Sequence, residues 1–380
     1  AETAMTNRGN PLFRADHVGS LLRPPAIVEA RAATLTDGAL TSPDLKPTED
    51  AAIADVVAMQ ESLGLGLVTD GEFRRSFWHY DFMDGLTGLN VVQRTDRTGV
   101  QFSGPQLRPY FPEISERIDF PDDHPMLDHF RYLSSVATAT PKISIPGPSA
   151  CHFRTAADDI APPEYADIDL LFADISAAYA KAVQAFYDAG CRYLQLDDIF
   201  FAYLCDETQR ERKRAEGFDP DELIVTYADM LERAIADRPD DMTIAMHMCR
   251  GNFRSTWVAQ GGYDPAVDAI FNRTSVDVYL MEYDTERAGG LEPLRLLPKG
   301  TKRVMPGFIT TKTSELESID ELKVRFEQAS EYVDMDQLGI APQCGFASTE
   351  EGNEITVDDQ RAKLELVVAT ADALWGGVNG

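Results

Sequence analysis

The feature that most restricts the fold of this chain is a regular alternation of short apolar runs with longer amphipathic segments. Short apolar runs predict buried strands, and segments with a 3.6-residue period predict helices. Strands are expected at 13–18, 66–69, 142–145, 193–196, 242–245, 276–281, 303–305 and 338–340. Nearly all of them precede a helical pattern, at 26–33, 48–63, 170–189, 221–236, 265–271, 319–332 and 357–375. Eight such units in 380 residues predict a (β/α)8 TIM barrel.

A doubly wound open sheet is the alternative fold for this alternation. It is disfavoured because no Gly-x-Gly-x-x-Gly sequence or phosphate loop follows the first expected strand. We expect residues 1–380 to form one barrel domain, with residues 1–10 as a disordered lead-in. The alternation breaks down at 89–131, where 90–97 and 99–103 look like a hairpin and prolines punctuate the rest. This segment is interpreted as an insertion after the second strand that folds over one end of the barrel.

Composition and charge exclude several classes of function. A net charge of −28 argues against nucleic acid or an anionic membrane as a partner. No apolar run approaches the roughly 18 residues that a membrane span needs. The first residues lack the basic-then-apolar pattern of a signal peptide, so a cytoplasmic protein is expected. Five scattered cysteines, an odd number, indicate reduced thiols rather than a disulfide framework.

Unusual polar side chains follow the expected strands directly. In a barrel these strand ends meet at one face, where active sites of this fold lie. His247 and Cys249 are two residues apart at the end of a strand, so they point to the same side. Cys191 and Cys205 lie in or beside apolar runs and are expected to pack in the core. The polar residues at strand ends are Ser20, Glu72, Asp197, His247, Cys249, Glu282 and Cys344.

Four of these residues form a set that a tetrahedral zinc ion accepts, with one nitrogen, two sulfurs and one carboxylate. They are His247, Cys249, Glu282 and Cys344. A coordinated thiol is deprotonated at neutral pH, so zinc at this site would activate a thiol, and a replaceable Glu282 would let a substrate sulfur enter.

Glu72 and Asp197 are expected at the same mouth of the barrel. They are interpreted as an acid/base pair, as solvated loop charges, or as a clamp for a cationic group. The clamp suits an amino-acid thiol, whose ammonium needs anionic partners. Among the histidines, three also lie near strand ends (His17, His79 and His152), whereas two are expected on the solvated surface (His124 and His129).

The motifs at these strand ends resemble the catalytic barrel of cobalamin-independent methionine synthase, over about 13–375 and in the same order. They are Val18-Gly19-Ser20, Asp70-Gly71-Glu72, Pro146-Gly147-Pro148, Gln195-Leu196-Asp197-Asp198, His247-Met248-Cys249, Glu282 and Pro342-Gln343-Cys344-Gly345.

The resemblance implies a zinc enzyme of methionine biosynthesis that methylates the thiol of homocysteine. Its pattern implies that Ser20, Glu72 and Asp197 bind the carboxylate and ammonium of homocysteine. It also implies that zinc is held by His247, Cys249, Glu282 and Cys344. The family's methyl donor is a methylated tetrahydrofolate with a glutamate tail.

The chain departs from the family in three places. The full-length enzymes carry two barrels, and one is expected here. Lys312 stands where the family has a catalytic histidine, and Asp198 stands where it has a glutamate. A lysine can deliver a proton or steady an anion, although it is not equivalent to histidine as an acid near neutrality. In these departures the chain resembles the short, single-barrel relatives of the family. We expect Lys312 and Asp197 to act in catalysis and Arg74 to contact the substrate.

Two other functions remain open from the sequence. An enzyme that alkylates coenzyme M by opening an epoxide would need cations for a sulfonate, which Arg74 and Arg75 supply, but the acidic pair Glu72 and Asp197 disfavours that ligand. A thiol-binding or metal-binding relative without catalysis is the other, because the family's histidine is missing. The uroporphyrinogen decarboxylase type of barrel shares the architecture and does not need this zinc set.

Overall fold

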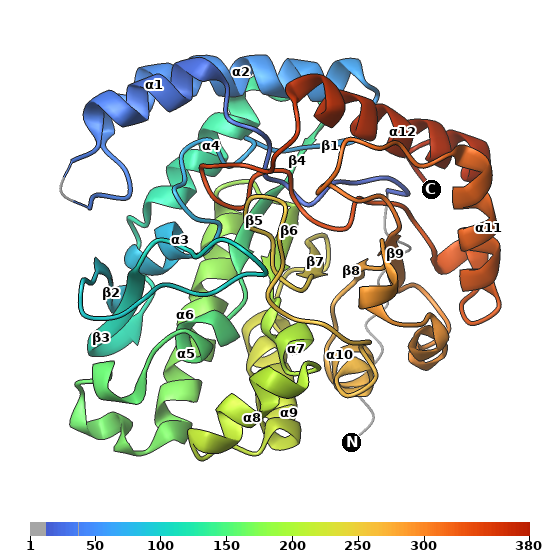
Figure 1. Cartoon of the computed structure of the whole chain (residues 1–380). Helices are drawn as coiled ribbons and strands as arrows, with labels where there is room; N and C mark the ends of the chain where they lie inside the picture. Colours follow the sequence, from blue (N-terminus) through green and yellow to red (C-terminus); the bar gives the residue numbers. More distant parts are fainter. Residues whose placement is uncertain (1–12, 37) are drawn as a thin grey trace.

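The computed structural model describes residues 13–36 and 38–380, and its parallel strands form the expected (β/α)8 barrel with helices outside (Figure 1). The expected lead-in at 1–10 lies outside the described residues. Five parallel strands pair in the order of the chain. They are β5 (Ile143–Pro146), β6 (Tyr193–Asp197), β7 (Thr243–Met248), β8 (Val278–Glu282) and β9 (Arg303–Gly307).

The remaining barrel positions are made by shorter pairings. β1 (Leu67–Val68) pairs in parallel with β4 (Thr140–Pro141), which leads into β5. On the other side, Leu338 bridges to Val304 of β9, and Ile340 bridges to Ala15. The expected strands at 13–18 and 338–340 are therefore present in their places as isolated bridges rather than as regular ladders.

Side chains span the gap between residues 13–18 and β1, where the described chain shows no backbone ladder. Gln60 of α2 (Lys46–Ser62) accepts a hydrogen bond from the Thr69 amide (3.0 Å) and donates to the Thr69 carbonyl (2.8 Å). The same Gln60 Oε1 lies 2.8 Å from His17 Nε2. A helix side chain thus satisfies the strand groups that a neighbouring strand would otherwise pair.

The barrel helices follow from apolar periodicity and clear start signals. Asp219 caps α9 by accepting from the amides of Asp221 and Glu222, and Thr356 forms a capping box with Asp359 at the start of α12. None of the helices among the described residues is long and apolar enough to cross a bilayer. The main outer helices are α1 (Pro25–Thr34), α2, α4 (Pro125–Val136), α6 (Ile168–Asp188), α9 (Pro220–Ile235), α10 (Val267–Arg273), α11 (Ile319–Ser330) and α12 (Val357–Trp375). Shorter helices are α3 (Tyr80–Asp84), α5 (Ser149–Phe153), α7 (Phe200–Tyr203) and α8 (Glu207–Ala215).

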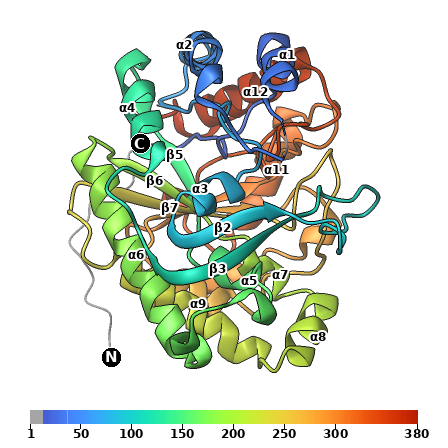
Figure 2. The same ribbon diagram turned by 90° about the vertical axis from the view of Figure 1, so that its left-hand side faces the viewer.

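The insertion is present, but its expected boundaries were wrong. Its hairpin pairs β2 (Thr87–Gln93) with β3 (Tyr110–Asp119), not 90–97 with 99–103, and lies beside α3 and α6 (Figure 2). Pro112 within β3 obscured that strand, because proline is uncommon inside a ladder. Residues 125–131 belong to α4.

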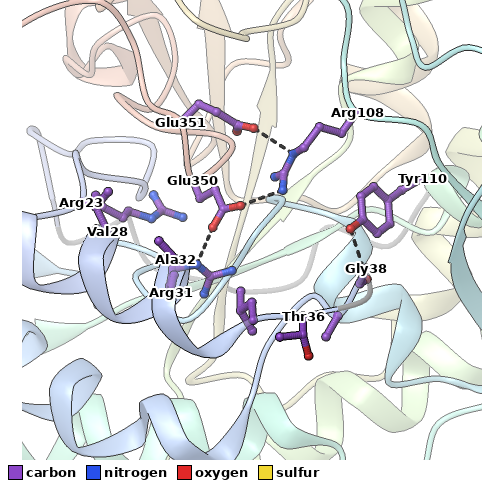
Figure 3. A pocket seen from close by; sticks show the side chains of 12 residues that line it. Arg23, Val28, Arg31, Ala32, Thr36, Gly38, Arg108, Tyr110, Glu350 and Glu351 are labelled. Atoms are coloured by element: carbon purple, nitrogen blue, oxygen red, sulfur yellow. Dashed lines mark hydrogen bonds and ion pairs between the residues drawn. The ribbon is translucent and has the colours of Figure 1, made fainter.

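The loop between β2 and β3 reaches the mouth of the barrel. Phe102 packs against Phe253, which follows β7, with ring centroids 5.4 Å apart. Arg108 forms ion pairs with Glu350 (2.7 Å) and Glu351 (2.8 Å), in the loop that follows the last barrel position (Figure 3). The insertion therefore contacts two of the loops that carry strand-end residues.

A buried ammonium lies inside the barrel. Lys142 Nζ donates to both carboxylate oxygens of Asp16 (2.9 and 2.8 Å), to Gln195 Oε1 (2.7 Å) and to the His17 carbonyl. The side chains of Lys142 and Asp16 are both fully buried. Gln195 in turn donates to Asp197 Oδ1 (2.7 Å), at the mouth of the barrel.

We predict that Lys142→Met will destabilise the fold by about 3–5 kcal/mol, because it leaves the Asp16 carboxylate buried without its cation. Urea unfolding measures the free energy. The control is Lys181→Met, since Lys181 pairs with Asp119 on the surface and such pairs contribute about 0–1 kcal/mol. Equal effects of the two substitutions would show that the internal pair does not stabilise the barrel.

Candidate active site

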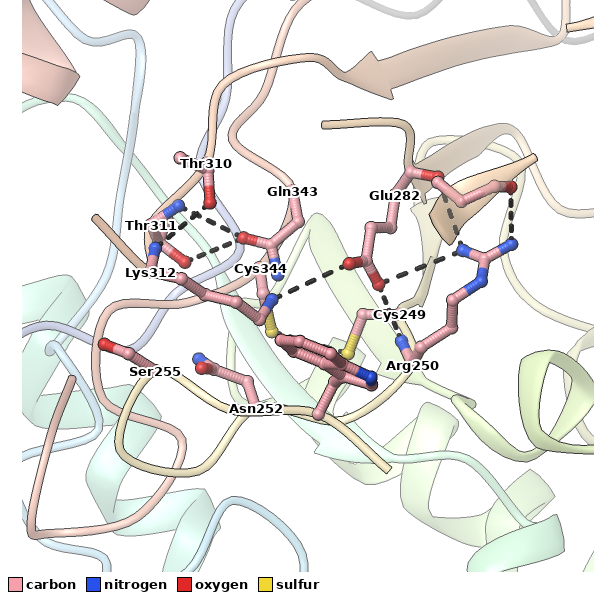
Figure 4. Close-up of polar contacts among 12 residues, drawn as sticks. Cys249, Arg250, Asn252, Ser255, Glu282, Thr310, Thr311, Lys312, Gln343 and Cys344 are labelled. Atoms are coloured by element: carbon pink, nitrogen blue, oxygen red, sulfur yellow. Dashed lines mark hydrogen bonds and ion pairs between the residues drawn. The ribbon is translucent and has the colours of Figure 1, made fainter. Parts of the chain in front are cut away.

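Three potential metal ligands meet at the mouth of the barrel. His247 is the last residue but one of β7, Cys249 directly follows this strand, and Cys344 lies in the loop after Ile340. One ligand atom from each lies within 4.8 Å of the others, and all three residues are buried. The sulfurs of Cys249 and Cys344 are 3.5 Å apart (Figure 4). Two thiolates at ~2.3 Å from one tetrahedral zinc would be about 3.8 Å apart, so the observed spacing fits such an ion.

The imidazole of His247 supports the same interpretation. Neither of its ring nitrogens has a hydrogen-bond partner among the described residues, although both are buried. A buried polar atom without a partner is costly, and a metal ion would satisfy one of these nitrogens. The three residues therefore fit a metal ion of the kind that nitrogen and sulfur ligands prefer.

The two thiols at the site differ in acidity. Burial alone would raise the pKa of the Cys344 thiol. Its hydrogen bond with Cys249 and the nearby charges of His247 and Lys312 outweigh burial, so the pKa lies well below its ordinary value. The same sulfur–sulfur hydrogen bond, together with burial, raises the pKa of Cys249 well above its ordinary value. A cation beside the two sulfurs would favour the thiolate form of both.

The fourth expected ligand, Glu282, is held apart from these three. One of its carboxylate oxygens accepts a hydrogen bond from the Arg250 amide (2.8 Å). The other lies 3.7 Å from Lys312 Nζ, as Figure 4 shows. Its oxygens do not belong to the group of ligand atoms that lie within 4.8 Å of one another. The structure thus gathers His247, Cys249 and Cys344, and it pairs Glu282 with the lysine of the next loop.

Two buried carboxylates line the same pocket as the three potential metal ligands. Glu72 and Asp197 are each 4% exposed, so the interpretation of these groups as solvated loop charges is wrong. Glu72 has a left-handed backbone (φ 59°), which is unusual for a residue with a side chain and typical of functional sites. Burial raises the pKa of Glu72 to about 7, with Arg75 opposing and Asp197 adding to the rise. Burial also raises the pKa of Asp197.

Other residues complete the pocket, including several that the sequence did not single out. Ser20, expected at the substrate, lines it and accepts a hydrogen bond from the Ala347 amide (3.2 Å). Asn252 lies three residues after Cys249 and donates to the Gly345 carbonyl (2.7 Å). In the sequence, the closeness of Asn252 to the His-x-Cys motif was the signal that could have placed it at this pocket. The further lining residues are Val18, Trp78, Ile199 and Ser348.

Arg74 does not lie at this pocket. Its guanidinium pairs with Glu49 (3.4 Å) and Asp50 (2.5 Å) of α2, so the expected substrate contact was wrong. Its neighbour Arg75 instead pairs with Glu72 (2.8 Å) and donates to the Ser144 carbonyl (2.6 Å). Adjacent side chains in a loop point in different directions, and spacing alone does not tell which one faces the mouth.

The histidines outside the cluster have structural contacts. His79 stacks between Trp78 and Tyr80, at centroid distances of 4.3 and 3.7 Å. His124 was expected on the surface but is 2% exposed. Its Nδ1 accepts from the Met126 amide (3.1 Å) and caps α4. The proline that follows His124 was a helix-start signal that could have located this cap.

Comparison with known proteins places the chain in a family. The family model described as cobalamin-independent synthase, catalytic domain, matches residues 15–372. The chain belongs to that family and is methionine synthase-like. Among its relatives in Bacillus subtilis (strain 168), the uncharacterized protein YxjG is 46% identical over 377 residues, which cover 99% of this chain and 98% of YxjG. A second uncharacterized protein, YxjH, is 44% identical over 364 residues, 96% of this chain and 95% of YxjH.

Solved structures agree with this assignment. A Listeria monocytogenes structure, described as a candidate vitamin-B12-independent methionine synthase, is 37% identical with a TM-score of 0.75, over 97% of this chain and 100% of that one. The B12-independent methionine synthase from Shewanella sp. W3-18-1, solved with selenomethionine, has a TM-score of 0.67 at 18% identity, over 96% and 98% of the two chains. The second comparison bears on the fold alone.

Asp198 beside the site gives a test of its electrostatics. This carboxyl is fully buried, bonds to Ser149 Oγ and has a second oxygen without a hydrogen-bond partner in the described chain. Burial raises its pKa from 3.8 to about 7, with Ser149 opposing the rise and Asp197 adding to it. The folded protein therefore holds a proton that the unfolded chain releases, and this contribution to stability is present below pH 3.8 and lost as the pH rises to about 7.

We predict that Asp198→Asn will gain stability relative to the wild type as the pH rises from about 4 to 7. The largest slope is roughly 1.4 kcal/mol per pH unit, because one proton is involved. Urea unfolding at each pH measures the difference. Asp128→Asn, at a largely exposed carboxylate, is the control. A difference that does not change with pH would mean that Asp198 is ionised in the folded protein.

Proposed function

We propose that this protein is a zinc-dependent methyltransferase that moves a methyl group to the thiol of homocysteine or a similar amino-acid thiol. One observation carries the proposal: His247, Cys249 and Cys344 bring their ligand atoms within 4.8 Å of one another, in a pocket also lined by Glu72 and Asp197. Such ligands would hold zinc, and the two carboxylates would hold an ammonium. When bound there, zinc keeps a thiol deprotonated and nucleophilic at neutral pH.

The carboxylates support an amino-acid thiol as the substrate. Burial of Glu72 and Asp197 makes their ionised forms unfavourable in the empty pocket, and an ammonium between them would relieve that cost. Gln195 donates a hydrogen bond to Asp197, and Arg75 donates one to Glu72. Both carboxylates are therefore oriented before the substrate enters. The Ser20 hydroxyl lines the same pocket and is proposed to bind the substrate carboxylate. Asp197 is proposed to act in catalysis through this positioning of the thiol.

Lys312 is proposed to serve two purposes. Its ammonium is buried beside the thiols, where it would steady negative charge or protonate the leaving group of the methyl donor. It also lies 3.7 Å from Glu282, which keeps that carboxylate away from the three clustered ligands. A ligand position is thereby left for the substrate sulfur, and Glu282 is proposed as a ligand only when this contact is released.

Other substrates are less well supported. A sulfonate thiol such as coenzyme M needs a cation, but Arg75 is paired with Glu72 and is not among the lining residues of the pocket. Arg74 faces α2 instead. A protein without catalysis remains the second alternative, and turnover with any methyl donor would exclude it. The free thiols of Cys249 and Cys344 need a reducing compartment, so we expect the enzyme to work in the cytoplasm.

We predict that homocysteine will bind the zinc-loaded protein with release of about one proton, which comes from the thiol. Calorimetry at pH 8, in buffers that differ in ionisation enthalpy, measures the number of protons released. This pH is chosen because Glu72, with its pKa of about 7, is then mostly ionised before binding. Cys249→Ser should lose zinc and thiol binding, whereas Cys205→Ser, at a thiol bonded to the Phe201 carbonyl, should keep both. Binding of coenzyme M in place of homocysteine would overturn the proposed substrate.

We predict that Lys312→Met will bind zinc about tenfold more tightly and homocysteine about tenfold more weakly. Without the ammonium, the Glu282 carboxylate becomes available as a fourth ligand and competes with the substrate thiol. Competition with a chelator measures zinc affinity, and calorimetry measures thiol binding. Lys312→Arg keeps the charge beside Glu282 and is the matched control. Unchanged affinities in Lys312→Met would show that this contact does not govern the fourth position.

A further inference from the structure

A second cavity, which we call the arginine cavity, lies between α1, the insertion and the loop that follows Cys344 (Figure 3). It lies behind the pocket that contains His247, Cys249 and Cys344, which we call the thiol pocket. The volume of the arginine cavity is about 440 Å³, which is in the range of small-molecule sites. It shares no lining residue with the thiol pocket. Its charged lining consists of Arg23, Arg31, Arg108, Glu350 and Glu351.

Arg31 presents an unused donor to this cavity. Its side chain is 4% exposed. Its Nε pairs with Glu350, while Nη2 donates to the Leu40 carbonyl (2.9 Å) and to Ser76 Oγ. Its Nη1 is buried and has no hydrogen-bond partner among the described residues. An unsatisfied donor on a buried cation is costly, and an acceptor in the cavity would remove that cost.

Arg23 supplies positive charge that its own hydrogen bonds do not neutralise. Its guanidinium donates to the backbone carbonyls of Leu21, Gly71, Ala347, Glu72 and Arg75, at 2.7–3.4 Å. Carbonyl groups satisfy the donors but carry no net charge. Within the described lining, three arginines therefore face two glutamates, an excess of one positive charge in a chain of net charge −28. Among the described lining residues, Arg23 is the arginine that no glutamate of the lining pairs with.

We infer that this cavity binds the anionic group of a small molecule, a carboxylate or a phosphate. Guanidinium groups bind both by paired N–H donors, and here the donors are already oriented by their other bonds. The inference goes beyond the proposed methyl transfer and does not depend on the metal.

One wall separates the two sites. Residues 76–78 and 348–350 run side by side through a bridge between Phe77 and Thr349. The Trp78 amide donates to the Ser348 carbonyl (2.7 Å), and both of these residues line the thiol pocket. On the other side of the wall, Glu350 lines the arginine cavity. An anion in this cavity would therefore lie beside Glu350, in one of the two segments that shape the thiol pocket.

The test uses inorganic phosphate and glutarate as probes, titrated by calorimetry at constant ionic strength. We expect saturable binding to the wild type. Ala32→Glu, on α1 at the cavity, should weaken it at least tenfold by placing a carboxylate there, and Ala33→Glu, next along the helix but outside the lining, should leave it unchanged. Arg108→Gln should also weaken it at least tenfold, and Arg94→Gln, in the same insertion but paired with Asp96 and Glu113, should not.

The outcomes decide the inference directly. Absence of saturable binding in the wild type, or equal affinities in Ala32→Glu and Ala33→Glu, would overturn it. Zinc content and homocysteine binding, measured on the same variants, show separately whether the thiol site is intact. Competition between glutarate and a methyl donor would identify the anion as part of that donor, and independent binding would identify a separate ligand. Both results support an anion site.

Discussion

The buried ammonium of Lys142 is the contact on which the barrel and its mouth both depend. It joins Asp16 of the first barrel position to Gln195 of β6, and Gln195 orients Asp197 at the site. An ion inside a barrel is stable only if every acceptor around it is already in place, because its desolvation is costly. Closure of the barrel, which lacks a ladder at this point among the described strands, is therefore coupled to the position of a proposed substrate carboxylate.

The site above this network has an electrostatic character of its own. Glu72 and Asp197 are buried carboxyls with raised pKa values, and a hydrogen bond joins the sulfurs of Cys249 and Cys344. Each of these groups would ionise more easily with a cation beside it, whether an ammonium or a metal ion. The accumulation of acidic groups away from water is the feature that supports the proposal of an ammonium and a metal ion as the ligands of this pocket.

The sequence predicted the barrel and the clustering of His247, Cys249 and Cys344, because strand ends in this fold meet at one face whatever the loops do. It did not predict contacts that depend on loop conformation. The pairing of Glu282 with Lys312 joins the end of β8 to the loop after β9, and no local pattern encodes it. The choice between Arg74 and Arg75 is set by side-chain direction in a turn. β3 was missed because Pro112 interrupts a pattern that otherwise alternates.

The insertion contacts the mouth of the barrel through the loop between β2 and β3 rather than through the two paired strands. Phe102 packs against Phe253, four residues after Cys249, and Arg108 pairs with Glu350, six residues after Cys344. The loop between β2 and β3 thus connects the segments that follow two of the potential metal ligands. The contact of Phe102 is apolar, whereas that of Arg108 is a partly exposed ion pair that salt screens. The strength of the contact beside the arginine cavity therefore depends on ionic strength, and that of the Phe102 contact does not.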